Sequence, residues 1–181
     1  MAKIKLSALK GRYAGKPAAI LGGGPSMPEE LKRVPKESLL IAVNYHAQYY
    51  CRPNYMVYND APSTNPLMVK AVEEHKSVLV SPDPSSDILF DVDVWTGFYS
   101  SHTACWFAAY LGCDPIILCG HDLYQGEQKH CPPSTYYSEV FDYPLDFHLR
   151  PWLEDAKHKL PHPERIRAMS GPLVQLFGAY Q

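Results

Sequence analysis

The sequence predicts an α/β fold, with one domain spanning residues 1–181, a mostly parallel sheet of five or six strands, and helices on both faces. Short apolar runs rich in Ile, Val and Leu are nearly continuous rather than alternating, as expected for strands covered on both faces. These runs alternate with helical segments, which is typical of parallel sheets. The length of 181 residues fits one domain with a substantial core, whereas two full domains would be cramped.

The expected strands are six apolar segments, at 18–22 (AAILG), 39–43 (LLIAV), 55–58 (YMVY), 77–81 (SVLVS), 115–119 (PIILC) and 165–169 (RIRAM). Helices are expected at 27–33, 66–75 and 102–111, with another near 151–159 and a last one after SGP. The helix at 102–111 is the clearest, because its apolar residues share one face, Ser100 or Ser101 can cap it, and Gly112 can end it.

The composition is that of a globular protein and argues against two classes of partner. The net charge is −2, with 17 Lys and Arg against 19 Asp and Glu, so the chain lacks the basic footprint of a nucleic-acid-binding protein. The opening MAKIKLSALKGRYAGKP holds no apolar segment long enough for a signal peptide, and no later run could span a bilayer. Five cysteines without Cys-x-x-Cys spacing indicate reduced thiols. We therefore expect a cytoplasmic protein with neither nucleic acid nor membrane as partner.

The segment 125–163 differs from the rest of the chain. It is rich in proline, aromatic residues and histidine, and it includes HCPPSTYYSEVFDYPLDFHLRPWLED. Exposed aromatic residues at this density favour a contact over free solvent. Two interpretations stay open: a lid that closes over substrate, or an arm that packs on a second subunit of a homo-oligomer.

The stretch AAILGGGPSMPEEL (residues 18–31) puts three glycines between a strand and a helix. The glycines can simply make a turn, with Ser26 and Glu29 forming a capping box. Because glycines have no side chain to shield the backbone, they can also let an anion reach N–H groups at the helix N-terminus. The dinucleotide fingerprint is excluded, because Met27 follows where a third glycine is needed and Asn44 replaces the acidic residue. A Walker loop is excluded because Gly-Lys-Ser/Thr is absent.

Small, polar or ionisable residues follow each of the first five strands. In chain order they are GGGPS, NYH, NDAPS, SPDPSS and GHDLY. In open parallel sheets, ligands bind outside the carboxyl ends of the strands. Any exposed loop would also be polar, but five such ends, with Asn44, Asp60 and Asp122 directly at three of them, favour a binding cleft.

The combination of GGGPSM, NYH, PNYMVYND and SSHTACWFAAYLGCDPIILCGHDLY, spanning roughly residues 18–125, resembles a Rossmann-like superfamily with two known branches. One branch contains bacterial sialyltransferases that use a CMP-activated sugar. The other contains archaeal 6-hydroxymethylpterin diphosphokinases and many uncharacterised proteins. In the superfamily, a Gly-Pro-Ser loop and a serine-capped helix hold the nucleotide, and an Asn after the second strand lies near its phosphates. The resemblance implies these roles for Gly23, Gly24, Pro25, Ser26, Asn44 and Ser100.

Transfer from a nucleotide donor needs a cradle for the departing phosphate and a base for the incoming hydroxyl. The glycine loop and the N-terminus of the helix at 102–111 can supply the cradle. The candidate nucleotide-binding residues are therefore Gly22, Gly23, Gly24, Pro25, Ser26, Asn44, Asp60, Ser100 and Ser101.

Histidine suits the role of base because of its pKa, and four histidines fall in or after the cleft segments: His102, His121, His130 and His148. Neighbouring strand residues point to opposite faces, so His121 is expected to face away if Asp122 faces the cleft. We therefore assign His130 as the general base, and Asp122 as the catalytic residue that holds a metal or orients the substrate.

Asp60 and Asp122 could also hold a magnesium ion that bridges phosphates, as a diphosphokinase would require. The alternative is that both carboxylates cap loops through side-chain hydrogen bonds.

Three functions remain open. The chain can be a transferase acting on a nucleotide-activated substrate, either glycosyltransferase-like or diphosphokinase-like. It can be a protein that binds a nucleotide or sugar phosphate without catalysis. A nicotinamide-dependent oxidoreductase is the third, and it is disfavoured by the missing glycine and by Asn44.

Overall fold

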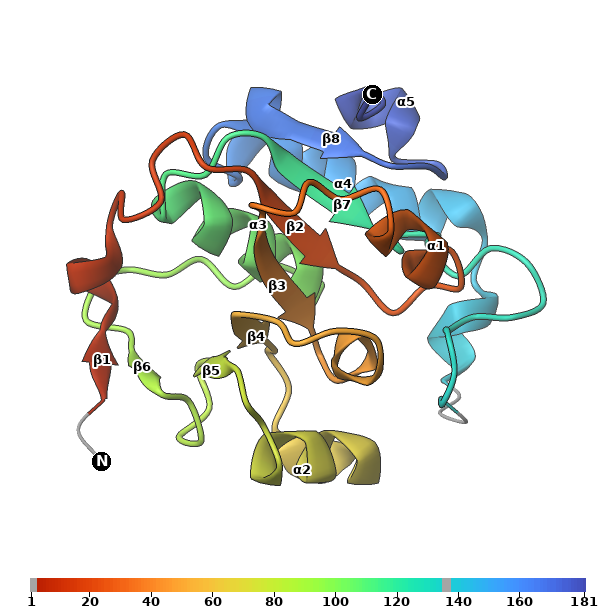
Figure 1. Ribbon diagram of the computed structural model, residues 1–181. Helices are drawn as coiled ribbons and strands as arrows, with labels where there is room; N and C mark the ends of the chain where they lie inside the picture. Colours follow the sequence, from red (N-terminus) through yellow and green to blue (C-terminus); the bar gives the residue numbers. More distant parts are fainter. Residues whose placement is uncertain (1–2, 135–137) are drawn as a thin grey trace.

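Six parallel strands form one sheet, which confirms the predicted fold class. The computed structural model describes residues 3–134 and 138–181. The strands are β2 (Ala18–Leu21), β3 (Leu39–Val43), β4 (Tyr55–Val57), β5 (Val78–Val80), β7 (Ile116–Cys119) and β8 (Ile166–Ala168). They lie in the order β5-β4-β3-β2-β7-β8 (Figure 1), and every neighbouring pair is parallel.

A second sheet consists of β1 (Ile4–Lys5) and β6 (Ile88–Leu89), which pair in parallel. The sequence did not predict this sheet. Two-residue segments show no periodicity that would distinguish a strand from a loop.

The helices are α1 (Met27–Leu31), α2 (Pro66–Glu73), α3 (Ser100–Tyr110), α4 (Leu145–His158) and α5 (Val174–Phe177). Short 3₁₀ helices span Leu6–Leu9, His46–Tyr49, Pro62–Thr64, Glu139–Asp142 and Pro163–Arg165. No helix in the described part of the chain is long and apolar enough to cross a membrane.

Both expected helix caps are wrong. Helix α3 begins at Ser100 itself, Tyr99 is its N-cap, and no side chain caps it. The Ser100 hydroxyl instead accepts a hydrogen bond from the Asn59 N–H at 3.1 Å. Ser26 forms no capping box, because its hydroxyl bonds elsewhere and Glu29 pairs with a lysine one turn on. Both serine side chains bond to residues that are distant in sequence instead of capping the nearby helix, the role that their sequence positions favour.

Helix α4 begins six residues before the expected start, and Pro151 stands inside it. Proline lacks the N–H that a helix interior uses, which is why the sequence favours a start near that residue. His148 and Trp152, four residues apart and therefore on one face, are both buried. Burial of this face stabilises the helix on both sides of Pro151.

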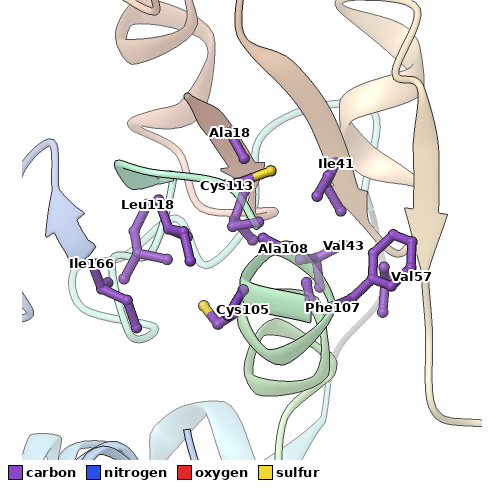
Figure 2. Packing of buried hydrophobic residues seen from close by; sticks show 14 of the residues in the cluster. Ala18, Ile41, Val43, Val57, Cys105, Phe107, Ala108, Cys113, Leu118 and Ile166 are labelled. Atoms are coloured by element: carbon purple, nitrogen blue, oxygen red, sulfur yellow. The ribbon is translucent and has the colours of Figure 1, made fainter. Parts of the chain in front are cut away.

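Successive strand residues alternate between two apolar cores, one on each face of the sheet. Ile20 and Ile41 pack in the core that contains α3, whereas Leu21 and Ala42 pack in the core that contains residues of α1 and α2. Figure 2 shows strand residues of the first core gathered around α3, among them Ala18, Ile41, Val43, Val57, Leu118 and Ile166. Coverage on both faces explains why the strands read as continuous apolar runs.

The strand order reverses between β2 and β7. The chain runs outward from β2 to β5 and then places β7 on the other side of β2. In open α/β sheets the crevice at such a switch point is where ligands bind. The loop after β2 and the loop after β7 therefore meet where a site is expected.

We predict that Phe107→Ala lowers the free energy of unfolding by about 3–5 kcal/mol, as for other large-to-small changes of a buried phenylalanine. Phe107 is 1% exposed and its ring meets Tyr55 edge-on at 5.0 Å. Urea denaturation measures the change. Phe98→Ala is the matched control. Because Phe98 is 61% exposed, this substitution should change the free energy of unfolding by no more than about 0.5 kcal/mol. Equal costs for the two variants would contradict this description of the core.

Candidate functional site

Two adjoining cavities open at the carboxyl ends of β2, β3 and β7. The first has a volume of ≈ 100 Å³ and is lined by the loops after β2 and β7 and by the start of α3. The second has a volume of ≈ 260 Å³ and extends toward the loops after β3 and β4 and toward residues 138–141. Asn44, His46, Tyr99, Ser100, Tyr124 and His130 line both cavities. The two cavities therefore form one cleft.

Most of the predicted site residues converge on this cleft. The first cavity is lined by Gly22, Gly23, Gly24, Asn44, Ser100, Ser101, Asp122 and His130. Asp60 lines the second cavity. Pro25 and Ser26 line neither cavity, although Ser26 contacts the lining residue Asp122.

The glycine loop is fixed to the end of β7 by its own backbone. The N–H of Gly22 donates to the Cys119 carbonyl at 2.8 Å, and the N–H of Gly24 donates to the Gly120 carbonyl at 2.9 Å. Within the described residues, the Gly23 N–H donates to no protein acceptor. Of these three N–H groups, that of Gly23 alone has no acceptor in the part of the chain that the structure describes.

The three glycines are required by close packing rather than by backbone conformation, since none of them has a positive φ. A Cβ on Gly22 would collide with the Gly120 carbonyl oxygen, and one on Gly24 would collide with the Asp122 carboxylate. A Cβ on Gly23 would lie 2.6 Å from Nδ1 of His46. At all three glycines, the protein itself fills the space on the side where a Cβ would lie.

Asp122 holds the start of α1. Its Oδ2 accepts hydrogen bonds from the backbone N–H and from the hydroxyl of Ser26, each at 3.0 Å. This is the role of a carboxylate at a helix N-terminus, where N–H groups lack intrahelical partners.

Glu30 also connects α1 to the end of β7. The sequence did not predict this role. Glu30 is 3% exposed, its Oε2 accepts from the Gly120 N–H at 2.7 Å, and its Oε1 accepts from the Ser170 hydroxyl. Glu30 therefore ties α1 to the ends of β7 and β8. A single glutamate in a surface-like helix gives no sequence signal for such a role.

Three non-glycine residues with positive φ line the first cavity: Asn44 (57°), Leu123 (50°) and Tyr124 (59°). Asparagine adopts this region readily, but leucine and tyrosine do so at an energetic cost. Strained backbone of this kind concentrates at binding and catalytic sites.

Two stacked imidazoles lie at the junction of the cavities. The rings of His46 and His130 stack at 4.6 Å with 21° between their planes, and Tyr45 stacks on the far side of His46 at 4.0 Å. Nε2 of His46 and both ring nitrogens of His130 are buried and make no hydrogen bond within the described chain. Burial, with His130 beside it, lowers the pKa of His46 to about 3, and burial also lowers the pKa of His130. Burial therefore favours the neutral form of both imidazoles.

His46 was not among the predicted site residues. The sequence placed it in the polar NYH that follows a strand, but nothing local marks it as buried. Its position at the start of a 3₁₀ turn (His46–Tyr49) directs the ring back over Gly23.

His121 does not face away from the cleft, which corrects the expectation drawn from strand alternation. Both His121 and Asp122 line the first cavity. The alternation rule fails because β7 ends at Cys119 and Gly120 then has a φ of 67°. Burial lowers the pKa of His121 to about 4, and Nδ1 contacts the Cys119 carbonyl at 2.9 Å.

The two remaining candidate histidines lie behind the cleft. His102 is 0% exposed and its Nδ1 bonds to the Asp155 carboxylate. His148 is also 0% exposed, and its Nδ1 pairs with the Tyr99 hydroxyl at 2.8 Å. Neither residue lines the two cavities.

The charged groups of the cleft are few. Lys129 lines the first cavity; its Nζ donates to the Tyr124 carbonyl at 3.0 Å and lies 3.8 Å from the Asp142 carboxylate. Asp60 and Asp122 line different cavities, and the described residues contain no group of three or more His, Cys, Asp or Glu side chains placed to hold a metal ion. All five cysteines are free thiols.

No protein-family model and no curated protein sequence matches the chain. The fold is similar to that of the sialyltransferase CstII from Campylobacter jejuni, solved in complex with a substrate analogue, cytidine 5′-monophosphate (CMP). The TM-score is 0.58 at 14% sequence identity, over 93% of this chain and 86% of that chain. The chain has a sialyltransferase-like fold. This likeness concerns the fold; the superfamily of the resemblance, with both of its branches, stays a prediction.

We predict that Gly23→Ala destabilises the protein through His46 alone. The three atoms nearest to the added Cβ all belong to the His46 ring, and overpacking of this kind costs about 1–3 kcal/mol. A double-mutant cycle with His46→Ala, measured by urea denaturation, should show that most of this cost disappears when the ring is absent. The same cost in both backgrounds would contradict the contact.

We also predict that stability falls steeply as the pH drops below about 6.5. The folded-state pKa of His46 is lowered to about 3 and that of His121 to about 4, mainly by burial, whereas unfolded histidine titrates near 6.5. Their stabilising effect is therefore complete above about pH 6.5 and is lost toward pH 3, at up to about 1.4 kcal/mol per pH unit for each. Urea midpoints at pH 7.5, 6 and 5 measure it, and His46→Gln should flatten the profile. A stability that is constant over this range would contradict the buried neutral imidazoles.

Proposed function

We propose that the protein is a glycosyltransferase-like enzyme that transfers a sugar from a CMP-activated donor. The observation that carries the proposal is the cleft at the switch point, with unpartnered imidazoles and a free backbone N–H, in a fold shared with a sialyltransferase solved with CMP. A nucleotide is thus the expected ligand of the first cavity.

In this proposal the donor phosphate lies between the Gly23 N–H and the N-terminus of α3. Ser100 and Ser101 line the cavity at the first turn of that eleven-residue helix, where the dipole favours an anion. Lys129, which lines the same cavity, adds a positive charge. These groups would stabilise the CMP that departs as the bond to the sugar breaks.

His130 is the general base of the proposed reaction. Its ring lines both cavities, so it can lie between the donor in the first and an acceptor in the second. Its neutral form, favoured by burial, can accept the proton of the incoming hydroxyl. Its stacking on His46 fixes the plane of the ring.

Asp122 acts as a positioning residue in this proposal, because its Oδ2 holds Ser26 and thereby the Gly-Pro-Ser turn. Asn44 and Asp60 contribute polar groups toward the second cavity. A magnesium ion on Asp60 or Asp122 would belong to the diphosphokinase alternative.

We predict that CMP raises the melting temperature by about 5–10 °C at 100 times its dissociation constant, which corresponds to about 2.7 kcal/mol. Differential scanning fluorimetry with and without magnesium measures this shift. ATP serves as the comparison, since a melting-temperature shift with ATP and magnesium that is larger than the shift with CMP would favour the diphosphokinase alternative. No shift with millimolar CMP would contradict the proposed donor.

His130→Asn should lower the rate of CMP release from CMP-sialic acid by about 10²–10⁴-fold while CMP binding is retained, because a positioned base contributes that factor. His158→Asn, which changes a histidine with a 66% exposed side chain, is the control and should leave the rate unchanged. Full activity of His130→Asn would place the base elsewhere in the cleft. CMP binding with no turnover of wild type would favour the non-catalytic alternative.

A further inference from the structure

Three exposed aromatic rings lie in contact with one another, and one of them, that of Phe98, lines the second cavity. Phe98 is 61% exposed, Tyr143 is 46% exposed and Phe147 is 39% exposed. Burying such rings would normally contribute to folding. We call these three residues the aromatic corner.

The aromatic corner is one connected group. The rings of Phe98 and Phe147 meet at 6.3 Å with 76° between their planes, and those of Tyr143 and Phe147 meet at 4.6 Å with 76°. Phe98 also packs perpendicular to Tyr99 at 4.8 Å. Perpendicular contacts use only part of each ring, and the exposure of Phe98 leaves most of its surface free.

The aromatic corner is continuous with the cleft. Phe98 and Tyr99 line the second cavity, which residues 138–141 close on the other side. Tyr143 and Phe147 follow that wall in the chain, through the turn Glu139–Asp142 and the first turn of α4. A molecule resting on the corner can therefore extend through the second cavity to His130.

We propose that the aromatic corner is the acceptor subsite and that it binds a pyranoside by the apolar C–H face of the sugar ring. The proposal rests on the proposed transferase function. A pyranose has one face of C–H groups, which suits the negative face of an aromatic ring, and hydroxyls on its edge, which suit the polar residues of the second cavity. Three rings are too few for a stable protein interface, which needs about 800 Å² per partner.

The proposed step is balanced without any further reactant. The acceptor oxygen forms a bond to the anomeric carbon of the donor sugar, and the bond from that carbon to the CMP phosphate oxygen breaks. The hydroxyl proton passes to His130, and the bonding electrons leave with CMP. The part of segment 125–163 that carries Tyr143 and Phe147 then serves as a wall for substrate rather than as an arm for a second subunit.

The test uses methyl β-D-galactopyranoside as the probe, because its axial O4 leaves a continuous C–H face on one side. Saturation-transfer-difference NMR with the full chain should show the strongest transfer to the protons of that face. Phe98→Ala and Phe147→Ala should each weaken probe binding by about 2- to 12-fold, the range expected for an aromatic contact. Tyr49→Ala removes a ring of similar exposure (47%) that lies outside the cleft, and it should change nothing.

CMP titrations of the same variants separate the two proposals. Unchanged CMP affinity with weakened galactoside binding supports the acceptor subsite. No galactoside signal, or equal binding by Phe98→Ala and wild type, overturns it. If the Phe98→Ala change weakens CMP instead, the corner belongs to the nucleoside and the acceptor subsite is refuted. Galactoside binding without any CMP binding would leave the corner in place and reject the CMP donor.

Discussion

The structure of the cleft depends on how the loop after β2 is joined to the end of β7. Two backbone hydrogen bonds, from the N–H groups of Gly22 and Gly24, fix this loop to carbonyls of the neighbouring strand end. The Asp122 carboxylate extends the connection to Ser26, and Glu30 returns it from α1 to the Gly120 N–H. Each partner lies 90 to 97 residues away in sequence from the group that it meets. A continuous set of hydrogen bonds thus joins the loop after β2 to the end of β7 at the switch point of the sheet. We call this set of bonds the junction.

This junction determines the electrostatics of the first cavity. The carboxylate of Asp122 is turned toward N–H and O–H donors of the α1 start rather than left unpaired in the cavity. The three imidazoles that line the cavity, of His46, His121 and His130, all have pKa values lowered by burial. The cavity therefore offers neutral imidazole nitrogens, a lysine and a helix N-terminus, an arrangement that suits an anionic group better than a cation.

The sequence was sufficient to predict the sheet and the end of it that carries the cleft, because both follow from local patterns. Continuous apolar runs mark buried strands, and the polar residues after them must gather at one edge of a parallel sheet. It was insufficient where a distant partner decides the outcome. Ser26 and Ser100 have capping positions but bond to Asp122 and Asn59. His46 and Glu30 carry no local signal, and His121 departs from strand alternation because the strand ends before it.

Close packing at the glycine loop divides the cleft into a part that tolerates no side-chain change, which we call fixed, and a part that can vary, which we call the variable walls. The side of the loop after β2 has no room for a side chain at any of its three glycines, so substitutions there act first on stability. Elsewhere the side chains at the cleft are less buried: Tyr124, which lines the second cavity, is half-buried, and Phe98 and Phe147 are exposed. Recognition of the nucleotide phosphate would then be built into the fold, whereas the choice of acceptor would rest with residues such as Phe98 and Phe147. His130 belongs to the variable walls but stacks on His46 beside the glycine loop, which places the proposed base where the two parts meet.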